Sequence, residues 1–210
     1  MSSDSDAIRI LTVDDHPVLR DGIASLIADE SDMLIAGEAA NGREAIEQFR
    51  RLHPDVTLMD LQMPEMNGLD ALTAIRAEFP EARIIVLTTY TGDVQILRAL
   101  RAGAFAYLLK SLLRKELLTT IRAVHAGKKA LSPEVSFELA EHAVDAALSP
   151  GEVRVLRLIA QGKSNREIAA HLLTTEDAIK NHVKTILSKL DANDRTHAVV
   201  IALKRGIIEL

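Results

Sequence analysis

Three carboxylates follow directly after two apolar segments of this chain. Asp14 and Asp15 come after residues 8–13, and Asp60 comes after residues 56–59. Both segments have the apolar and β-branched content of a buried strand, and parallel strands that lie side by side bring their carboxyl ends together. Carboxylates held that close raise one another's pKa unless a cation neutralises them, and hard oxygen ligands suit Mg2+. These residues therefore predict a Mg2+ site.

Two later apolar segments end in groups that would complete a site for phosphoryl transfer. Thr88, a hydroxyl donor, follows residues 84–87, and Lys110, a cation, follows residues 105–109. Such a transfer needs a nucleophile such as the Asp60 carboxylate, a metal, and positioned groups that neutralise the transferred oxygens. The combination therefore predicts a phosphoacceptor site.

Each of these residues also has an ordinary interpretation. A single Asp at a strand end is usually a loop or helix-cap residue, Lys110 could form a surface ion pair, and Thr88 could be a plain strand residue. Their order at the ends of successive strands favours the phosphoacceptor interpretation. His16 stands beside the acids, but its place before Pro17 at a helix start indicates a capping or solvent-facing residue.

The segments that must position these groups alternate between strand and helix patterns. Strands are expected at residues 8–13, 33–38, 55–60, 83–88 and 104–109. Helices are expected at residues 17–29, 42–52, 67–78, 92–101 and 113–126. Five such units in succession predict an α/β fold, a doubly wound parallel sheet with helices on both faces.

Length and composition limit the class of protein. The 210 residues allow two domains, and the absence of cysteine excludes disulfides and thiolate metal sites. Residues 1–6 are polar and acidic, which predicts a disordered start and no signal peptide, and no apolar run is long enough to cross a membrane. We therefore expect a cytoplasmic protein.

The charge differs between the two ends of the chain. Residues 1–147 carry 15 Lys and Arg against 23 Asp and Glu, whereas residues 148–210 carry 10 against 7. Contact with nucleic acid is therefore disfavoured in the first part and permitted in the second.

A second domain is predicted to begin at residue 148. Residues 128–147 have the character of a linker with a short helix from Pro133, after which Ser149 and Glu152 form a capping box around Pro150. Three further helices are expected at residues 164–171, 175–190 and 194–205, which makes this an all-α domain of four helices.

The helix expected at 175–190 has an apolar stripe and an opposite polar face. The polar face carries Lys180, Asn181 and Lys184. A helix packed on one side and rich in donors on the other can lie in the major groove, where Lys donates to guanine and Asn pairs with adenine. The pattern therefore indicates DNA binding.

Residues 8–127 resemble a response-regulator receiver domain. The residues that carry the likeness are Asp14-Asp15-His16, Met59-Asp60-Leu61-Gln62-Met63-Pro64, Gly68, Thr88 and Tyr107-Leu108-Leu109-Lys110. The resemblance implies the flavodoxin-like strand order 2-1-3-4-5 and transfer of a phosphoryl group to Asp60 from a histidine kinase or a small phosphodonor. It also implies that Asp14, Asp15, Asp60 and the backbone carbonyl of Gln62 bind Mg2+, while Lys110 and Thr88 contact the phosphoryl oxygens.

The same resemblance implies a switch formed by Thr88 and Tyr107. Phosphorylation adds about −1.5 to −2 charges at Asp60, and Thr88 can move toward the new oxygens. In the family, the aromatic residue on the fifth strand, here Tyr107, follows into the vacated space. The alternative is a static, partly buried packing residue. One position departs from the family pattern, because Ser111 follows Lys110 where receivers commonly carry proline.

Residues 148–208 resemble the LuxR-type helix-turn-helix of the NarL/FixJ class of response regulators. The residues that carry the likeness are Ser149-Pro150, Glu152, Val155-Leu156, Ser164-Asn165-Arg166-Glu167-Ile168-Ala169, Ile179-Lys180, His182-Val183, Leu190 and Arg195-Thr196. The resemblance makes Lys180, Asn181 and Lys184 base-reading or groove-lining candidates. Candidates for phosphate contacts are Lys163, Asn165, Thr175 and Lys189. The last helix would pair two DNA-bound domains through Ala198, Val199 and Ala202, or its apolar face would close the core.

We therefore predict a two-component response regulator with a receiver at 1–127, a linker at 128–147 and a DNA-binding domain at 148–210. A sensor histidine kinase would phosphorylate Asp60 and so control homodimerisation and binding to promoter DNA. Contact with RNA polymerase is left open, and no membrane partner is expected.

Two alternatives to this function remain. One is a constitutive DNA-binding regulator whose receiver is only structural. The other is a Mg2+-dependent phosphohydrolase, which would need a second general acid and a substrate cap that the short loops do not offer. On the preferred interpretation, the receiver is no enzyme beyond its own phosphoryl transfer and autodephosphorylation.

Overall fold

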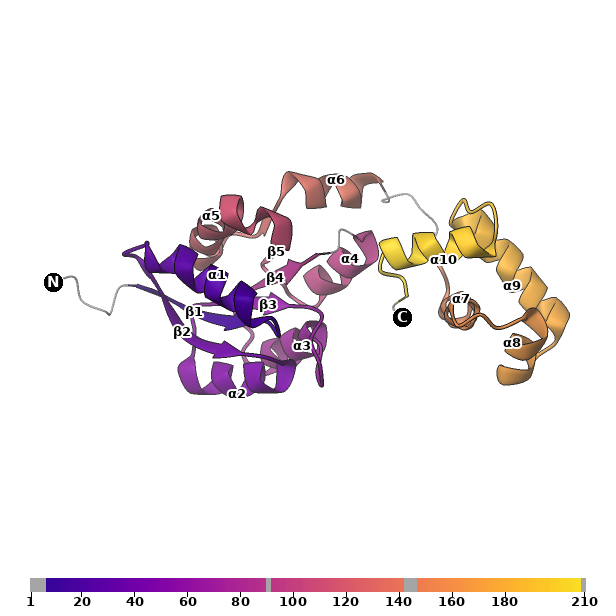
Figure 1. Ribbon diagram of the computed structural model, residues 1–210, viewed down its shortest axis with the longest axis horizontal. Helices are drawn as coiled ribbons and strands as arrows, with labels where there is room; N and C mark the ends of the chain where they lie inside the picture. The colour runs from indigo at the N-terminus through magenta and orange to yellow at the C-terminus, as the bar shows by residue number, and fades with distance from the viewer. Residues whose placement is uncertain (1–6, 90–91, 142–146, 209–210) are drawn as a thin grey trace. The chain divides into compact units, whose positions relative to one another are not determined.

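A computed structural model describes residues 7–89, 92–141 and 147–208 of the chain (Figure 1). Residues 1–6, for which disorder was expected, lie outside the described residues. Contacts within the chain divide it into two compact units. The first comprises the described residues up to Thr89 together with Ile96–Ser136, and the second comprises the described residues of Tyr90–Gln95 and Phe137–Leu210.

The first unit is built on a parallel sheet with the order β2-β1-β3-β4-β5-β6. Its strands are β1 (Ile8–Val13), β2 (Met33–Ala39), β3 (Val56–Asp60), β4 (Ile84–Thr88), β5 (Ala106–Leu109) and β6 (Ala130–Leu131). The first five follow the order implied by the resemblance, so that prediction is confirmed. After β2 the chain crosses back over β1, and the later strands are added on the other side of β1, beginning with β3. Ligands of such sheets bind at the carboxyl ends of the strands where the order reverses, here β1 and β3.

Helices cover both faces of the sheet, as the alternating pattern predicted (Figure 1). They are α1 (Pro17–Ala28), α2 (Gly42–Leu52), α3 (Gly68–Glu78), α4 (Asp93–Arg101) and α5 (Leu113–His125). Helices α1 and α5 share one apolar core with the strands, while α2 and α3 pack against each other on the opposite face. Because both faces are covered, every residue of β3 and β4 is buried.

Two short elements were not predicted. Residues 110–112 form a 3-10 turn, η1 (Lys110–Leu112), and Ala130 and Leu131 of the expected linker form β6, which pairs with β5 through Ala106 and Tyr107. Two strand residues are too few to show an alternating pattern, and the preceding lysines suggested a solvated segment. The expected linker helix is α6 (Pro133–Glu141), and residues 142–146, where it was expected to end, lie outside the described residues.

In the described part of the second unit, four helices surround one apolar core. They are α7 (Pro150–Ala160), α8 (Asn165–His171), α9 (Glu176–Lys189) and α10 (Arg195–Lys204). Both α7 and α8 begin with a complete capping box, Ser149 with Glu152 and Ser164 with Glu167. Thr175 caps the start of α9, and the short segment between α8 and α9 makes these two helices a helix-turn-helix.

The apolar face of α10 closes this core. Ala198 and Ala202 are buried, Val199 is partly buried, and Val200 is the exposed large apolar residue of the helix. Of the two interpretations of this helix, closing the core holds for Ala198 and Ala202. Exposure of these two alanines for pairing was a wrong expectation, because a helix this short needs its small-residue face to approach α7 closely.

Candidate functional site

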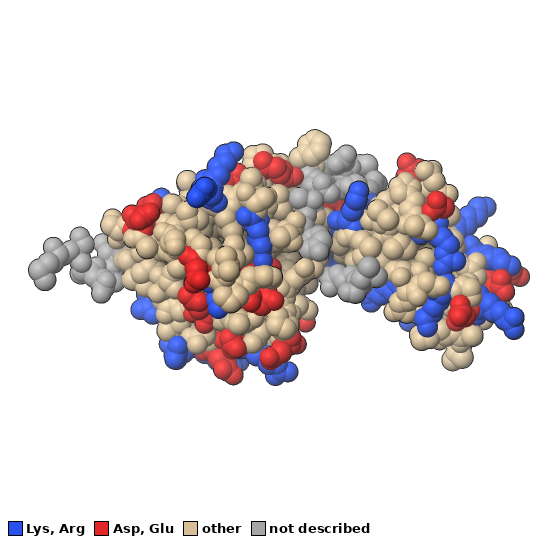
Figure 2. Space-filling model, in the orientation of Figure 1, with Lys and Arg blue, Asp and Glu red and all other residues tan. Residues whose placement is uncertain are grey.

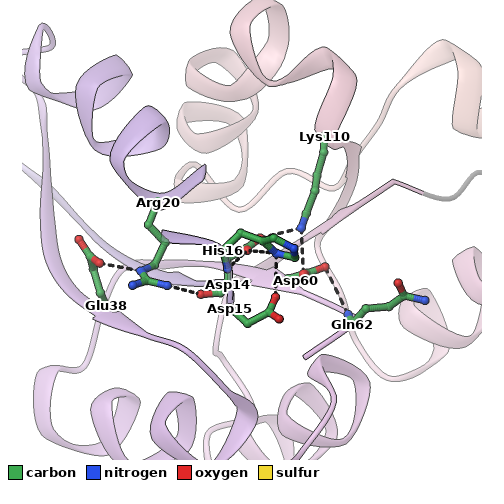
Figure 3. A network of polar contacts seen from close by, with 8 residues as sticks. All are labelled: Asp14, Asp15, His16, Arg20, Glu38, Asp60, Gln62 and Lys110. Carbon is green, nitrogen blue, oxygen red and sulfur yellow. Dashed lines mark hydrogen bonds and ion pairs between the residues drawn. The ribbon is translucent and has the colours of Figure 1, made fainter. Parts of the chain in front are cut away.

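The sheet brings the predicted carboxylates together. Val13 and Met59 are register partners on the neighbouring strands β1 and β3, so Asp14 and Asp60, the next residue of each strand, lie at the same edge (Figure 3). Ligand atoms of Asp14, Asp15, His16 and Asp60 all lie within 4.8 Å of one another. Asp14 is 0% exposed and Asp60 is 3% exposed, whereas Asp15 is partly open to solvent.

Lys110 enters this pocket from the end of β5 (Figure 3). Its ammonium donates to Asp60 Oδ2 at 2.8 Å and lies 2.7 Å from Asp14 Oδ2. One lysine therefore serves two buried carboxylates. The Lys110 side chain is only 13% exposed, which makes its charge effective over this short distance.

The surroundings shift the protonation of both partners. Burial raises the pKa of Asp60 above its ordinary value, and the contact with Lys110 offsets this only in part. Burial lowers the pKa of Lys110, but its contacts with Asp14 and Asp60 outweigh burial and leave the pKa raised. Lys110 is therefore a permanent cation at neutral pH, while Asp60 is a carboxylate that solvent stabilises poorly.

The donor set fits Mg2+. Three carboxylates face one lysine, so the pocket keeps an excess of negative charge that a divalent cation would neutralise. The partner of the buried Asp14 Oδ2 is the Lys110 ammonium at 2.7 Å, whereas the buried atom Asp15 Oδ1 accepts no hydrogen bond. Carboxylate oxygens with open positions are the ligands that Mg2+ uses, and waters usually complete its shell.

The loop after β3 folds back over Asp60. The backbone N–H of Gln62 donates to Asp60 Oδ1 at 3.3 Å, and that of Gly68 donates to the Leu61 carbonyl at 3.0 Å. A Cβ atom on Gly68 would overlap the backbone carbonyl oxygen of Asp60. Glycine is therefore required at this position, because any side chain would push the loop away from the acceptor residue.

Two residues that support the acid pair were missed from the sequence. Arg20 of α1 donates to the backbone carbonyl of Asp14 at 2.6 Å and to Glu38 Oε2 on β2 at 2.8 Å (Figure 3). The arginine thus ties the end of β1 to two other elements. An Arg one turn into the helix that follows an acid pair was the available signal, but nothing in the sequence indicated its partner.

His16 lies against the acids. It precedes α1 as the N-cap residue, but its side chain makes no cap hydrogen bond. Its Nδ1 lies 3.1 Å from Asp14 Oδ1 and 2.8 Å from Asp15 Oδ1, while the side chain is 68% exposed. The expectation of a capping or solvent-facing residue is confirmed, since His16 occupies the N-cap position and its side chain is exposed.

Thr88 and Tyr107 lie next to the pocket in the middle of the sheet. Thr88 ends β4, one residue beyond the register partner of Asp60, and it is 2% exposed. The Tyr107 ring is fully buried on β5, and burial raises the pKa of its hydroxyl to about 12, against the effect of a hydrogen bond with Thr88. The two predicted switch residues are therefore in contact. No peptide bond in the described part is cis, the one between Lys110 and Ser111 included.

A second candidate site lies on α9. Lys180, Asn181 and Lys184 are exposed on this helix, and Ile179 and Ile186 are buried on its other side. Figure 2 shows Lys and Arg side chains over the surface of the second unit. Lys180 pairs with Asp177 at 3.1 Å within the helix, and this contact raises the pKa of Lys180. The exposed face of α9 therefore carries two lysines and an asparagine, groups that can donate to a polyanion.

The predicted phosphate contacts separate into two groups. Lys163 and Asn165 are partly exposed around the start of α8, and Thr175 is the N-cap of α9, so these three lie near the turn between the helices. Lys189 instead donates to the buried carboxylate of Glu152 at 2.8 Å and to the Ala147 carbonyl at 3.2 Å. This geometry gives Lys189 a role in the core of the unit, apart from the other three.

Two parts of the chain match families of known proteins. Residues 10–122 match the response regulator receiver domain, and residues 146–202 match the bacterial regulatory proteins of the luxR family. Over 207 residues the chain is 38% identical to the response regulator protein VraR of Staphylococcus aureus, a match that covers 96% of this chain and 99% of the relative.

Solved structures show the same likeness. The response regulator ChrA of a heme-sensing two-component system is 34% identical, with a TM-score of 0.58 over 97% of this chain and all of that one. The RcsB response regulator of Salmonella typhimurium is 27% identical, with a TM-score of 0.73 over 92% of this chain and 98% of that one. An RcsB–DNA complex gives the same TM-score and identity over 94% and 98% of the two chains. No helix in the described part of our chain is long and apolar enough to cross a bilayer.

Proposed function

This chain belongs to the two-component response regulators of the NarL/FixJ class, which join a receiver domain to a LuxR-type DNA-binding domain, and from that premise we propose that phosphorylation of Asp60 controls its dimerisation and its binding to promoter DNA. It is a regulator of transcription and not a classical enzyme. The observation that carries the proposal is the buried Asp60 carboxylate held by Lys110 beside Asp14.

The chemistry at Asp60 is phosphoryl transfer. One Asp60 oxygen attacks the phosphorus of a phosphohistidine on the sensor kinase, the P–N bond breaks as the P–O bond forms, and the histidine nitrogen leaves with the electron pair. Lys110 lies within 2.8 Å of Asp60, where its charge offsets the negative charge of the incoming oxygens. Autodephosphorylation is the attack of water on the same phosphorus, which releases phosphate and restores the carboxylate.

Mg2+ would be held by Asp14, Asp15, Asp60 and the backbone carbonyl of Gln62. When bound, it polarises and neutralises the transferred phosphoryl oxygens. The residues around it have their own tasks. Arg20 holds the Asp14 backbone, and the Gln62 N–H holds Asp60 Oδ1, so both carboxylates keep one orientation before and during transfer.

Thr88 and Tyr107 carry the signal away from the pocket. The phosphoryl group brings new charge to Asp60, and the Thr88 hydroxyl turns toward it as a donor. Because Thr88 now contacts Tyr107, that turn frees the Tyr107 hydroxyl and moves its ring. The surface around β5 then changes shape. The interface of the homodimer lies on this surface or on the surface next to it.

The exposed face of α9 reads the promoter. Lys180, Asn181 and Lys184 face the major groove, while Lys163, Asn165 and Thr175 contact phosphates and fix the register. A dimer places two such helices on half-sites one helical turn apart. Solved structures of the similar RcsB contain dimers on DNA, and we extend that arrangement to this chain. A promoter-binding protein works where the DNA is, in the cytoplasm, with a sensor histidine kinase upstream and RNA polymerase as a candidate contact.

The decisive experiment combines phosphorylation with footprinting. The purified chain is incubated with Mg2+ and acetyl phosphate, and intact-mass measurement should show one added phosphoryl group that Asp60→Asn lacks. DNA fragments selected from the host genome should then be protected more strongly by the phosphorylated protein. Footprints and transcription that stay the same in Asp60→Asn with an active kinase would favour the constitutive regulator. Steady hydrolysis of external phosphate esters that requires Asp60 would favour the phosphohydrolase.

A further inference from the structure

The imidazole of His16 stands at the mouth of the acid pocket with no role in the proposed phosphoryl transfer. We infer that His16 makes this pocket a binding site for a divalent transition-metal ion such as Co2+ or Mn2+, held by His16 Nδ1 with the carboxylates of Asp14 and Asp15. The inference rests on the proposed function, since it assigns a further ligand to the same metal pocket.

The distances around Nδ1 are those between neighbouring ligands of one metal ion. Nδ1 lies 2.8 Å from Asp15 Oδ1 and 3.1 Å from Asp14 Oδ1. Donors bound at about 2.0–2.2 Å from a common ion lie roughly 3 Å apart. An ion can therefore enter among these three atoms with small shifts of the exposed His16 and Asp15 side chains.

The protons available do not satisfy this cluster. A neutral imidazole Nδ1 carries at most one hydrogen, so it can donate to one of the two carboxylate oxygens that face it. Asp14 Oδ1 already accepts from the backbone N–H of His16, and Asp14 Oδ2 has the Lys110 ammonium at 2.7 Å, whereas the buried atom Asp15 Oδ1 accepts no hydrogen bond. Buried acceptors without donors are costly. A cation at this point would serve the oxygen that the histidine leaves unsatisfied.

The backbone holds His16 in place for this role. The N–H of His16 donates to Asp14 Oδ1 at 2.8 Å, and its carbonyl accepts from Leu19 and Arg20 in the first turn of α1. Arg20 also fixes the Asp14 carbonyl. Only the side-chain torsions of His16 remain free, so metal binding has to fix only these torsions and loses little conformational entropy.

The imidazole determines which metal ions bind more tightly. Mg2+ prefers oxygen ligands and gains little from a nitrogen, whereas imidazole suits first-row transition metals, whose affinity rises from Mn2+ toward Cu2+. The two kinds of ion use the same carboxylates and so exclude each other. The 68% exposure of the His16 side chain leaves the ring accessible from solvent.

The test uses the full-length chain with Mn2+ and Co2+ as probes. Pulsed EPR of bound Mn2+ should show coupling to a directly bound nitrogen, and His16→Ala should abolish it. The same variant should bind Co2+ at least ten times more weakly, by calorimetry, while its Mg2+ affinity changes less than twofold. His16 makes no side-chain cap bond to the first turn of α1, so alanine removes only the contacts of Nδ1 with Asp14 and Asp15.

His125→Ala is the matched control. His125 ends α5, a helix of 13 residues whose first turn adjoins Lys110. At 1.5 Å per residue, it lies about 18 Å farther along that helix. This variant should keep the nitrogen coupling and the Co2+ affinity.

The outcomes separate this inference from the proposed function. If Mg2+ and acetyl phosphate modify Asp60 but the wild type shows no nitrogen coupling, or His16→Ala retains it, the His16 inference is overturned and the receiver chemistry stands. If neither Mg2+ nor Mn2+ binds and Asp60 stays unmodified, the proposed function fails, and with it the metal pocket.

Discussion

The acid pocket and the exposed face of α9 use charge in opposite ways. In the pocket, Asp14 and Lys110 are buried and come from the ends of different strands, so each charge depends on the others. On α9, Lys180 and Lys184 are exposed and come from one helix, one turn apart. The pocket is therefore a product of tertiary structure, whereas the helix face is largely a product of local sequence.

The comparison teaches where substitutions matter. A buried charge that loses its partner carries a desolvation penalty, while an exposed charge returns to water at almost no cost. We expect pocket variants to change stability and chemistry together. Variants of the helix face should change DNA binding alone. Each prediction below tests one side of this contrast.

Gly68→Ala should have the largest effect. The new Cβ would overlap the Asp60 carbonyl oxygen, so the loop that holds Asp60 must move. We expect a loss of about 3 kcal/mol in the free energy of unfolding, as in overpacked sites, and a strong loss of phosphorylation by acetyl phosphate. Gly22→Ala is the control, because nothing lies within 4 Å of its Cβ and alanine favours the helix interior. Equal stability of the two variants would contradict the close approach.

Mg2+ should stabilise the receiver through its carboxylates. At a concentration of 100 times its dissociation constant, a ligand that binds only the folded state adds about 2.7 kcal/mol. Thermal unfolding of the wild type should therefore shift upward with Mg2+, and EDTA should reverse the shift. Asp15→Asn should reduce the shift strongly. An undiminished shift in that variant would place the ion elsewhere.

Lys189→Ala and Lys180→Ala should separate stability from DNA binding. Removal of Lys189 leaves the Glu152 carboxylate buried without its lysine, which costs about 1–3 kcal/mol. Lys180 is 55% exposed and pairs only within α9, so its loss should cost less than about 0.5 kcal/mol. Chemical denaturation measures both. If Lys180→Ala is the more destabilising, the contrast between buried and exposed charges fails here.

The same two variants should rank the other way in DNA binding. Lys180→Ala should weaken binding to the selected operator. If Lys180 contacts a phosphate, the salt dependence of the affinity should fall by about one unit of slope. If it reads guanine, the preference for that base should fall by about 1–3 kcal/mol. Fluorescence anisotropy at several salt concentrations distinguishes these results. Lys189→Ala should leave the slope unchanged under conditions where it is folded.

The smallest expected effect is the pH dependence of the difference in stability between Asp60→Asn and the wild type. Burial raises the pKa of Asp60 in the folded protein above its value of 3.8 in the unfolded chain. Within the window between these two values, the folded state binds more protons, so the Asp60 contribution to stability falls as pH rises and remains unfavourable at neutral pH. Asp60→Asn removes this unfavourable contribution to stability, and Lys110 keeps its ion pair with Asp14. The variant should be more stable than the wild type at pH 7, and the difference should shrink as pH falls toward 4.

Much of the first unit followed from the sequence. The apolar segments that precede Asp14, Asp60, Thr88 and Lys110, together with residues 33–38, predicted the first five strands to within about two residues. Buried parallel strands are continuous apolar runs, and such runs are readable without a structure. β6 was missed because two residues show no periodicity. The contact of Arg20 with Asp14 was missed because an arginine in a helix gives no sign of which distant carbonyl it reaches.

The second unit shows the same division. Its helix starts were predicted because caps are local, and the capping box of Ser149 with Glu152 formed as expected, while the box of Ser164 with Glu167 was not predicted. The partner of Lys189 was not predicted, and the burial of Ala198 and Ala202 was only one of two interpretations left open. Both depend on how α7, α9 and α10 pack against one another.

By itself, the sequence determined the types of residue at each strand end, the helix caps and the alternation of strands and helices, since these are properties of neighbouring residues. The tertiary structure alone decided that one lysine serves two buried carboxylates and that Lys189 pairs with Glu152. Hydrogen bonds and ion pairs act over about 3 Å, and only packing brings residues 37 or 50 positions apart to that distance.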